Sequence, residues 1–384
     1  MVDDGSVEVS VVIPCLNEET GIVKVVEEAR AGLSRAGLEG EVIVVDNASE
    51  DRSASLARAA GARVVHEPRR GYGSAYLAGL SAARGTYIVM TDADGTYPIE
   101  TLGVFVERLR NGADIVIGNR FRGTMHPGAM PWTNRYIGNP ILSGMLNLLF
   151  HSGVGDAHCG LRAIRRDSLA TLNLSATGME FASEMVIKAG KRRLRLDELP
   201  VDYRPRLGES KLSRFEDAWR HVRFMLVRSP AFLFIIPGGL SVAVGLGLLV
   251  YLGVDTRAGE WATGVSMASG ALTLIGAQVV MLGLFARTYG VVYLGESDER
   301  LERAWRRLRL EHGLLVSGVV LLVGAGVTLY SYFDFTHDPR LGMLGLTLVA
   351  LGVAGAFASF FLSILGLSEH AVALRRDPTS DADR

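Results

Sequence analysis

The pattern of hydrophobic positions divides the chain into two parts of different character. In the first part, short β-branched runs at 9–13, 42–45 and 63–65 alternate with segments of helical periodicity. Strands that alternate with helices of about 10–15 residues are typical of βαβ units around a parallel sheet. We therefore predict an α/β domain with a Rossmann-like parallel sheet. Four further helices are predicted: one over 20–35, one that ends near 60, one that ends at 83, and one over 99–110. Two further strands are predicted over 87–90 and 114–118.

The last part of the chain is dominated by four long apolar runs, at 232–254, 262–285, 313–333 and 341–366. Each is close to or above the roughly 20 residues that a helix needs to cross about 30 Å of hydrocarbon. One such run alone would also suit a buried core helix. Four in succession, with charges confined to the connections, predict an all-α domain of four transmembrane helices.

Residues 213–228 join the two parts and have the pattern of a basic amphipathic helix. Phe215, Trp219, Val222 and Met225 fall on one stripe, with arginines interleaved around it. Such a helix suits the membrane interface, and packing in the core of the first domain is the alternative. The predicted organisation is a first domain over 1–212, an interfacial helix over 213–230, a membrane domain over 231–370 with a cytosolic amphipathic connection over 287–312, and a disordered tail over 371–384.

Lysine and arginine are unevenly shared among the predicted connections. The segment before the first run, the connection 287–312 and the tail are basic, whereas the other two connections hold only Arg257 and Arg340. Basic connections tend to stay on the cytosolic side of a membrane. The first residues also lack the basic and apolar regions of a cleaved signal peptide. These patterns predict an integral protein of the cytoplasmic membrane, with the first domain and both termini in the cytosol.

Composition narrows the function classes. A formal net charge of −1 provides no field that would favour nucleic acid. The two cysteines, Cys15 and Cys159, lie far apart and indicate neither a disulfide framework nor a zinc site. No ionisable residue lies well inside a predicted span, which argues against an ion-coupled pump.

The strongest candidate chemistry lies where the strand 87–90 runs into Asp92 and Asp94. On an extended backbone these two side chains would point the same way, and two adjacent carboxylates repel unless a cation lies between them. Mg²⁺ and Mn²⁺ take carboxylate oxygens together with substrate phosphates. The pattern predicts a metal-diphosphate site at the carboxyl end of a central strand. The alternative is a solvated acidic turn, because Asp-x-Asp-Gly is also good turn chemistry.

Other predicted strands also end in polar residues. Asn17 and Glu18 follow the first strand and Asp46 ends the second, although Asp46 alone would also suit a capping role. The first strand does not lead into G-x-G-x-x-G, and no phosphate-binding G-x-x-x-x-G-K-[ST] occurs. The row of polar strand ends therefore favours a nucleotide that is read by carboxylates and held by a metal, rather than a dinucleotide cofactor.

Five motifs follow one another in the first domain: Val11-Val12-Ile13-Pro14-x-x-Asn17-Glu18, Val45-Asp46-Asn47-x-Ser49, Gly71-x-Gly73-x-Ala75-x-x-x-Gly79, Asp92-Ala93-Asp94 and Gly118-Asn119-Arg120. As a set they resemble the inverting GT-A glycosyltransferases of family 2, and within these the polyprenyl- and dolichyl-phosphate sugar synthases. The resemblance covers roughly residues 7–228. It implies a GT-A domain, a UDP- or GDP-linked sugar donor, Mg²⁺ or Mn²⁺, and a polyprenyl phosphate acceptor in the lipid bilayer.

The resemblance also implies roles for individual residues. The nucleotide-sugar donor would be bound by Pro14, Asn17, Glu18, Asp46, Gly71, Asp92 and Ala93. The metal would be held by Asp92 and Asp94. The acceptor phosphate would be held by Arg120, Arg135, Asn139, Arg206, Ser210 and Lys211. The catalytic set would be Asp92, Asp94, Arg120 and Asp156.

This chain departs from the family pattern at two places on the acceptor side. Asn139 stands where the family often has serine, and Asp-Ala-His-Cys-Gly at 156–160 replaces Asp-x-x-Ser-Gly. The fine acceptor geometry and the donor sugar therefore stay open. His158 is expected to be a hydrogen-bonded loop histidine rather than a base. Of Glu180 and Glu184, which share one helix face, at least one is expected to face the site.

The expected reaction moves one sugar, glucose or mannose, onto the lipid phosphate. A phosphate monoester is already anionic near neutral pH and needs no general base. A single displacement would invert the anomeric centre and give a β-linked product. A processive polysaccharide synthase of the same fold is one alternative, although its usual Gln-x-x-Arg-Trp motif does not occur. A non-catalytic membrane scaffold or flippase is another, and a homo-oligomer is left open.

Overall fold

The computed structural model describes residues 7–208, 214–254, 259, 261–294, 310–333 and 339–376. Contacts between Cα atoms divide the chain into two compact units, Met1–Met225 and Leu226–Arg384, and each is described by itself. Ser210, Lys211 and the predicted domain boundary at 212 lie outside the described residues. The same holds for most of the predicted connection 287–312 and for the end of the predicted tail.

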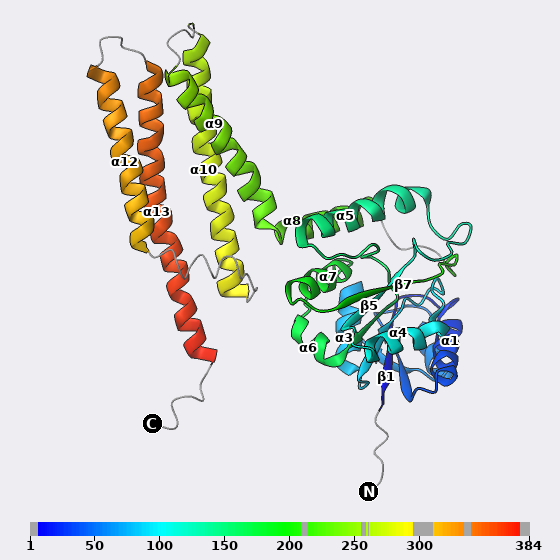
Figure 1. Cartoon of the computed structure of the whole chain (residues 1–384). Coiled ribbons are helices and arrows are strands. Elements are labelled where there is room, and N and C mark those ends of the chain that lie inside the picture. Colours follow the sequence, from blue (N-terminus) through cyan, green and yellow to red (C-terminus); the bar gives the residue numbers. More distant parts are fainter. Residues whose placement is uncertain are drawn as a thin grey trace, which may run out of the picture. The chain divides into compact units, whose positions relative to one another are not determined.

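The first unit is built on one seven-stranded sheet with the order β3-β2-β1-β4-β6-β5-β7 (Figure 1). The alternation of apolar runs located its first five strands to within two residues. The strands are β1 (Val9–Cys15), β2 (Gly40–Asp46), β3 (Arg63–His66), β4 (Tyr87–Met90), β5 (Ile115–Asn119), β6 (Arg162–Arg165) and β7 (Leu196–Pro200).

The sheet is mixed rather than parallel, which corrects the prediction. Strands β1, β2, β3 and β4 pair in parallel, but β6 runs antiparallel to both of its neighbours, β4 and β5. In this pairing Arg162 lies opposite Met90. The start of β6 therefore meets the end of β4, and the loop that leads into β6 arrives beside Asp92.

Helices cover the sheet and close its core. The side chains of β1, β2, β4 and β5 are almost wholly buried, so the residues pointing to either face of the sheet contact apolar helix faces. The helices and short helical turns are α1 (Ile22–Arg35), α2 (Ser53–Ala59), α3 (Tyr72–Ala82), η1 (Ile99–Thr101), α4 (Leu102–Arg110), η2 (Asn134–Gly138), α5 (Asn139–Phe150), α6 (Arg166–Leu172) and α7 (Phe181–Lys191).

Helix α8 (Arg214–Val227) ends the first unit and has two different faces. Met225 is fully buried in the core of this unit, with Val222 and Phe224 packed against it. Trp219 and Val227 are exposed. The stripe predicted from sequence is thus split, because Met225 packs inward whereas Trp219 faces outward; the side chain of Phe215 is outside the described residues.

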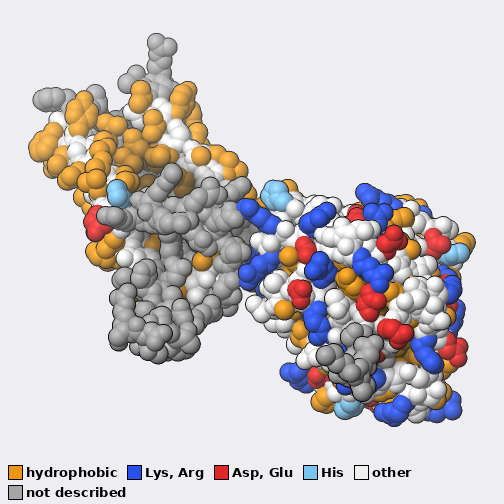
Figure 2. Space-filling view, turned by 60° about the horizontal axis from the view of Figure 1, so that its bottom comes forward, with side chains coloured by type: hydrophobic (Ala, Val, Ile, Leu, Met, Phe, Trp, Pro, Cys, Tyr) orange, Lys and Arg blue, Asp and Glu red, His pale blue; other side chains and the backbone are white. Residues whose placement is uncertain are grey.

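The second unit consists of long apolar helices, as predicted. Among the described residues, four helices are long and apolar enough to cross a membrane: Ala231–Val254, Trp261–Val292, Leu310–Phe333 and Pro339–Leu365. Hydrophobic side chains predominate on the described part of their surface that Figure 2 shows. Glycines allow close packing between them, as where a Cβ on Gly324 would lie 2.6 Å from the backbone nitrogen of Val349. The helices are η3 (Ala231–Ile235), α9 (Ile236–Val254), α10 (Trp261–Leu294), α12 (Leu310–Phe333) and α13 (Pro339–Arg376).

Candidate active site

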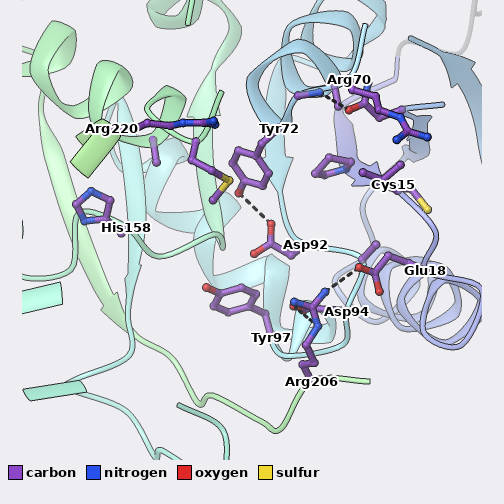
Figure 3. A pocket seen from close by; sticks show the side chains of 18 of the residues that line it. Cys15, Glu18, Arg70, Tyr72, Asp92, Asp94, Tyr97, His158, Arg206 and Arg220 are labelled. Atoms are coloured by element: carbon purple, nitrogen blue, oxygen red, sulfur yellow. Dashed lines mark hydrogen bonds and ion pairs between the residues drawn. The ribbon is translucent and has the colours of Figure 1, made fainter. Parts of the chain in front are cut away.

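A pocket of about 620 Å³ opens at the carboxyl ends of β1, β2 and β4. Parallel strands of an α/β sheet present their loops at this edge, which is where such folds bind ligands. Figure 3 shows its labelled side chains converging from several loops and from α8. The lining residues are Pro14, Cys15, Leu16, Glu18, Asn47, Arg70, Gly71, Tyr72, Ala75, Asp92, Ala93, Asp94, Tyr97, Arg120, His158, Met179, Ala182, Arg206, Arg220 and His221.

Asp92 and Asp94 both line this pocket, but not for the reason inferred from sequence. Strand β4 ends at Met90, and residues 92–95 form a turn in which Gly95 has a φ of 71°. Asp94 Oδ1 accepts hydrogen bonds from the Thr96 amide and hydroxyl, at 3.1 and 2.7 Å. The turn, rather than the alternation of an extended strand, brings both carboxylates to the same cavity.

Asp92 is the more unusual of the two carboxylates. Burial, followed by the charge of Asp94, raises its pKa to about 7. The Tyr72 hydroxyl donates a 2.9 Å hydrogen bond to its Oδ1 and partly opposes this shift (Figure 3). A Cβ on Gly160 would lie 2.3 Å from Oδ2 of Asp92, so only glycine leaves room for the carboxylate there. Asp92 is therefore held in place, and its burial disfavours the charged form.

These two carboxylates fit a hard divalent cation that takes its remaining ligands from a substrate. No group of three or more His, Cys, Asp or Glu side chains in the described part of the chain could hold a metal alone. Two carboxylates completed by phosphate oxygens and water are the usual environment of Mg²⁺ in phosphate-transferring sites. The donor set thus suits a metal-bound diphosphate better than a permanent protein metal centre.

The predicted donor-binding residues divide into two groups. Pro14, Glu18 and Gly71 line the pocket. Asn17 and Asp46 do not, because their side chains hold loops together. Asn17, with a φ of 51°, accepts a 2.7 Å hydrogen bond from the Glu50 amide. Asp46 accepts one from the Ser49 amide at 3.1 Å and lies 3.1 Å from His66 Nδ1. It does not cap a helix, because α2 begins only at Ser53 and has no side-chain cap.

Asn47, which directly follows β2, reaches this cavity, whereas Asp46 does not. Its Nδ2 donates hydrogen bonds to the carbonyl oxygens of Glu67 and Arg69, and its Oδ1 accepts one of 2.7 Å from the Gly71 amide. One side chain therefore holds the whole basic, glycine-rich loop that carries Arg70 to the pocket. Sequence reasoning assigned Gly71 of this loop to the donor site, but it quoted Asn47 only as part of a motif and did not name Arg70.

The start of α3 is fixed by a second loop, at residues 175–178. A Cβ on Gly73 would lie 2.1 Å from the carbonyl oxygen of Ala176, so the two backbones touch. Glu184 holds that loop, because its carboxylate accepts hydrogen bonds from the amides of Ser175 and Ala176, at 2.9 and 2.8 Å. Neither Glu180 nor Glu184 lines the pocket, contrary to expectation. Glu184 acts indirectly, by placing Tyr72 beside Asp92.

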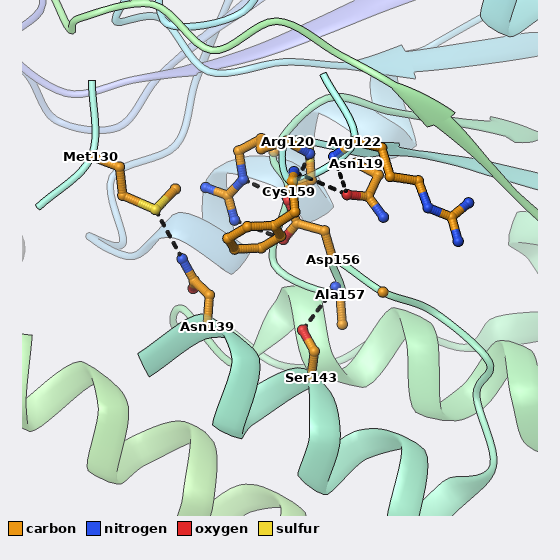
Figure 4. A network of polar contacts seen from close by, with 12 residues as sticks. Asn119, Arg120, Arg122, Met130, Asn139, Ser143, Asp156, Ala157 and Cys159 are labelled. Carbon is orange, nitrogen blue, oxygen red and sulfur yellow. Dashed lines mark hydrogen bonds and ion pairs between the residues drawn. The ribbon is translucent and has the colours of Figure 1, made fainter. Parts of the chain in front are cut away.

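Arg120 and Asp156 form a buried, two-pronged ion pair (Figure 4). Nε and Nη2 of Arg120 lie 2.7 and 2.8 Å from the two carboxylate oxygens of Asp156. The guanidinium also lies 5.2 Å from the ring centre of Tyr203. Arg120 lines the pocket, whereas Asp156 stands behind it. Asp156 therefore orients Arg120 and does not itself line the pocket.

The remaining predicted acceptor residues that the structure describes, Arg206, Arg135 and Asn139, are not gathered in one place. Arg206 lines the pocket and donates a 2.7 Å hydrogen bond from Nη2 to Glu18, with Nε 3.7 Å from Asp94. Arg135 and Asn139 do not line it. Arg135 lies 5.3 Å from the ring centre of Tyr136, and Asn139 contacts the Met130 sulfur at 3.5 Å (Figure 4).

Two histidines, His158 and His221, line the pocket, and Figure 3 shows His158 on the side opposite Cys15. Ser183 Oγ lies 3.0 Å from His158 Nε2 and 2.9 Å from His221 Nδ1. One hydroxyl carries one proton and can donate to only one of the histidines, so at least one histidine donates to Ser183. Burial lowers the pKa of both, that of His221 to about 4, which keeps the pair neutral at physiological pH. His158 is hydrogen-bonded, as expected, but His221 was not foreseen.

Comparison with known proteins shows which family this chain resembles. Residues 10–172 match the family described as glycosyl transferase family 2. Residues 284–366 match the family 2 C-terminal transmembrane region. A Haloferax volcanii protein named low-salt glycan biosynthesis hexosyltransferase Agl6 is 40% identical over 367 residues, which cover 93% of this chain and 89% of the relative. The chain belongs to glycosyltransferase family 2.

Two further similar proteins match part of this family 2 enzyme. A dolichyl-phosphate hexose transferase of Haloferax volcanii is 36% identical over 210 residues, which cover 54% of this chain and 88% of the relative. Glucosyl-3-phosphoglycerate synthase from Mycobacterium tuberculosis, solved with Mn²⁺, UDP and glucosyl-3-phosphoglycerate, is 24% identical. That match covers 57% of this chain and 77% of the other, with a TM-score of 0.44, and nothing further is drawn from it. The predicted family and the predicted enzyme class are confirmed.

Proposed function

We propose that this family 2 enzyme transfers one sugar, glucose or mannose, from a UDP- or GDP-linked donor to polyprenyl phosphate at the cytosolic face of the membrane. The product is a β-linked polyprenyl-phosphate sugar. The observation that carries the proposal is one pocket in which the Asp92 and Asp94 carboxylates are flanked by arginines, in a chain that also has four apolar helices of membrane-spanning length.

The donor lies along the pocket from β1 and β2 toward the acidic turn. Pro14, Asn47 and Gly71 supply an apolar and backbone-lined end for the nucleoside. Asp92 and Asp94 would hold a divalent cation such as Mg²⁺ or Mn²⁺, which when bound supplies Lewis-acid stabilisation of charge on the departing diphosphate. Asn17 and Asp46 support this end from behind by holding the loops that line it.

The acceptor needs alignment rather than activation. A phosphate monoester is anionic near neutral pH, so its oxygen attacks the anomeric carbon without a general base. Arg120, locked by Asp156 and stacked on Tyr203, keeps a fixed guanidinium beside the acidic turn. Positive charge that is already oriented lowers the barrier without reorganisation during the reaction. A single in-line displacement inverts the sugar configuration.

Exposed apolar side chains on the first unit suit a surface that rests against lipid. Most of them lie on the segment around η2 and α5 and on α8: Trp132, Tyr136, Ile137, Ile141, Leu148 and Trp219. Aromatic and aliphatic groups of this kind are typical of helices that lie in the membrane interface. The basic connections predicted on one side of the spans support the further proposal that the catalytic unit and both termini are cytosolic.

The deciding experiment uses the purified full chain in detergent or nanodiscs with polyprenyl phosphate, Mg²⁺ or Mn²⁺, and a panel of labelled UDP- and GDP-sugars. We expect one donor to give a lipid product carrying a single sugar, which mass spectrometry identifies. A ladder of longer products would instead favour the processive synthase. The absence of transfer and of donor hydrolysis with every donor would contradict the proposal and favour the non-catalytic scaffold or flippase.

A further inference from the structure

Helix α8 supplies two neighbouring side chains, Arg220 and His221, to the pocket. In Figure 3 Arg220 extends toward Tyr72 and the Asp92 side of the cavity, from the side opposite Arg70 and Cys15. Helix α8 ends at Val227, and three residues separate it from η3, where the first apolar span begins. The segment that carries Arg220 is therefore close in sequence to the part of the chain that meets lipid.

The position of Arg220 is fixed by its neighbour. His221 is buried and joined through the Ser183 hydroxyl to His158, and the two imidazole rings are 4.6 Å apart in an edge-to-face arrangement. One turn further along, Met225 is fully buried in the core. These contacts hold α8 against the catalytic unit and set the direction in which Arg220 leaves the helix.

The arginines that line the pocket differ in whether their charge is already balanced. Arg120 is paired with Asp156, Arg206 with Glu18, and Arg70 with Glu50. Arg220 makes no hydrogen bond or ion pair with any residue that the structure describes. It is thus the pocket cation with its hydrogen-bonding capacity left for a ligand. A guanidinium presents several donors in one plane and matches the oxygens of a phosphate monoester.

We propose that Arg220 binds the phosphate of the lipid acceptor, and that the His158–Ser183–His221 contact positions it. This assignment rests on the proposed function, since it names the residue that receives the acceptor on the side of the pocket opposite the nucleoside. It takes the place of Arg135, which does not line the pocket. It also gives a role to His158, which stands in the segment where this chain departs from its family.

The test compares Arg220→Gln with Arg223→Gln in the purified full chain. Arg223 is exposed on the same helix and does not line the pocket, so its replacement removes the same charge from α8. Initial rates are measured in detergent with a short isoprenyl phosphate, which needs no bilayer, and again with long-chain polyprenyl phosphate. Nucleotide binding is measured separately by titration with UDP and Mn²⁺.

We expect Arg220→Gln to raise the KM for both phosphates about 10- to 100-fold, the effect of losing a charged hydrogen bond, with UDP affinity unchanged. Arg220→Lys should recover part of the loss, and Arg223→Gln should stay within about twofold of the wild type. Equal effects of Arg220→Gln and Arg223→Gln, or a loss of UDP binding, would overturn the assignment. If the wild type transfers nothing to either phosphate but uses another acceptor, the proposed function fails and the assignment falls with it.

Discussion

The two ends of the pocket are built in different ways. At the donor end the lining side chains come from strand ends and short loops and are tied to one another, as Asn47 is to Gly71 and Arg70 is to Glu50. At the acceptor end Arg220 and His221 come from a helix that follows the sheet in sequence. The Ser183 hydroxyl and an edge-to-face ring contact join His221 to His158. The donor end is thus formed by the sheet itself, whereas the acceptor end depends on how α8 docks.

The largest effect should come from the carboxylates between the two ends. Asp94→Ala removes one of the two proposed metal ligands, so we expect transfer to fall by at least about 1,000-fold. The secondary structure, followed by circular dichroism, should be unchanged. Asp167→Ala is the matched control, because this carboxylate is 87% exposed and lies outside the pocket. Substantial metal-dependent turnover in Asp94→Ala would remove the metal assignment.

The next largest effect concerns the buried pair that stabilises the centre of the pocket. Asp156→Asn leaves the Arg120 guanidinium without its counter-charge, and breaking such a pair costs about 3–5 kcal/mol of unfolding free energy. The free energy is measured by denaturant unfolding of the purified protein in detergent. Asp197→Asn breaks an exposed pair with Arg108 at 3.4 Å and should cost about 0–1 kcal/mol. Equal losses would show that burial of the Arg120 pair is unimportant.

A third prediction concerns how metal affinity depends on pH. Because the pKa of Asp92 is raised to about 7, a metal must displace a proton below that pH. The apparent affinity for Mn²⁺ in the presence of UDP should fall about tenfold per pH unit below 7 and level off above about 8. Free Mn²⁺ is measured by electron paramagnetic resonance. An affinity that does not change between pH 5.5 and 8.5 would contradict this.

In the metal-free protein, raising the pH should lower the stability of the fold through Asp92, whereas it raises the affinity for the metal. A carboxyl whose folded pKa lies above its unfolded value stabilises the protein in its protonated form. That contribution is fully present below the unfolded value of 3.8 and is lost as the pH rises through about 7. The melting temperature without metal should therefore fall across this window, and Asp92→Asn should flatten the dependence. Added Mn²⁺ should restore more of the loss at pH 8 than at pH 6.

The smallest effect should be that of Ser183→Ala, which removes the hydroxyl between the two histidines. Arg220 would be held less firmly, so we expect the KM for the lipid phosphate to rise by about three- to tenfold, the value of one neutral hydrogen bond. The KM for the nucleotide sugar and kcat should stay near the wild type. Ser168→Ala is the control, since this buried serine pairs with Asp114. A uniform loss of kcat would indicate a merely structural role for Ser183.

The sequence predicts the elements that depend on local patterns and misses those that depend on contacts between distant segments. Strands β1 to β5 and the four apolar helices follow from local runs of hydrophobic residues, which depend only on neighbours in the chain. Strand β6 was missed because Arg162–Arg165 is short and charged at both ends, yet burial between β4 and β5 makes it a strand. Such a strand forms because it pairs with segments that are distant in the sequence, and the local pattern of residues does not indicate that pairing.

The site shows a similar division. Residues at strand ends, such as Glu18, Asp92 and Asp94, were predicted, because the carboxyl ends of strands converge at one edge. Arg135 was placed in the pocket only by resemblance, and the structure leaves it outside. The contact of His221 with Ser183, 38 positions earlier, was not foreseen. Read from its own residues, α8 shows only an amphipathic helix, and its docking determines which of its polar side chains face the cavity.

Helix α8 also has a practical consequence. It belongs to the catalytic unit, yet it is the last element before the apolar spans. A water-soluble fragment could be cut on either side of it, and the two products would differ in chemistry. A fragment that ends before Arg214 would keep the acidic turn and lose Arg220. We expect it to bind nucleotides but not the lipid phosphate. One that runs through Val227 would keep both halves of the reaction within a single soluble reagent.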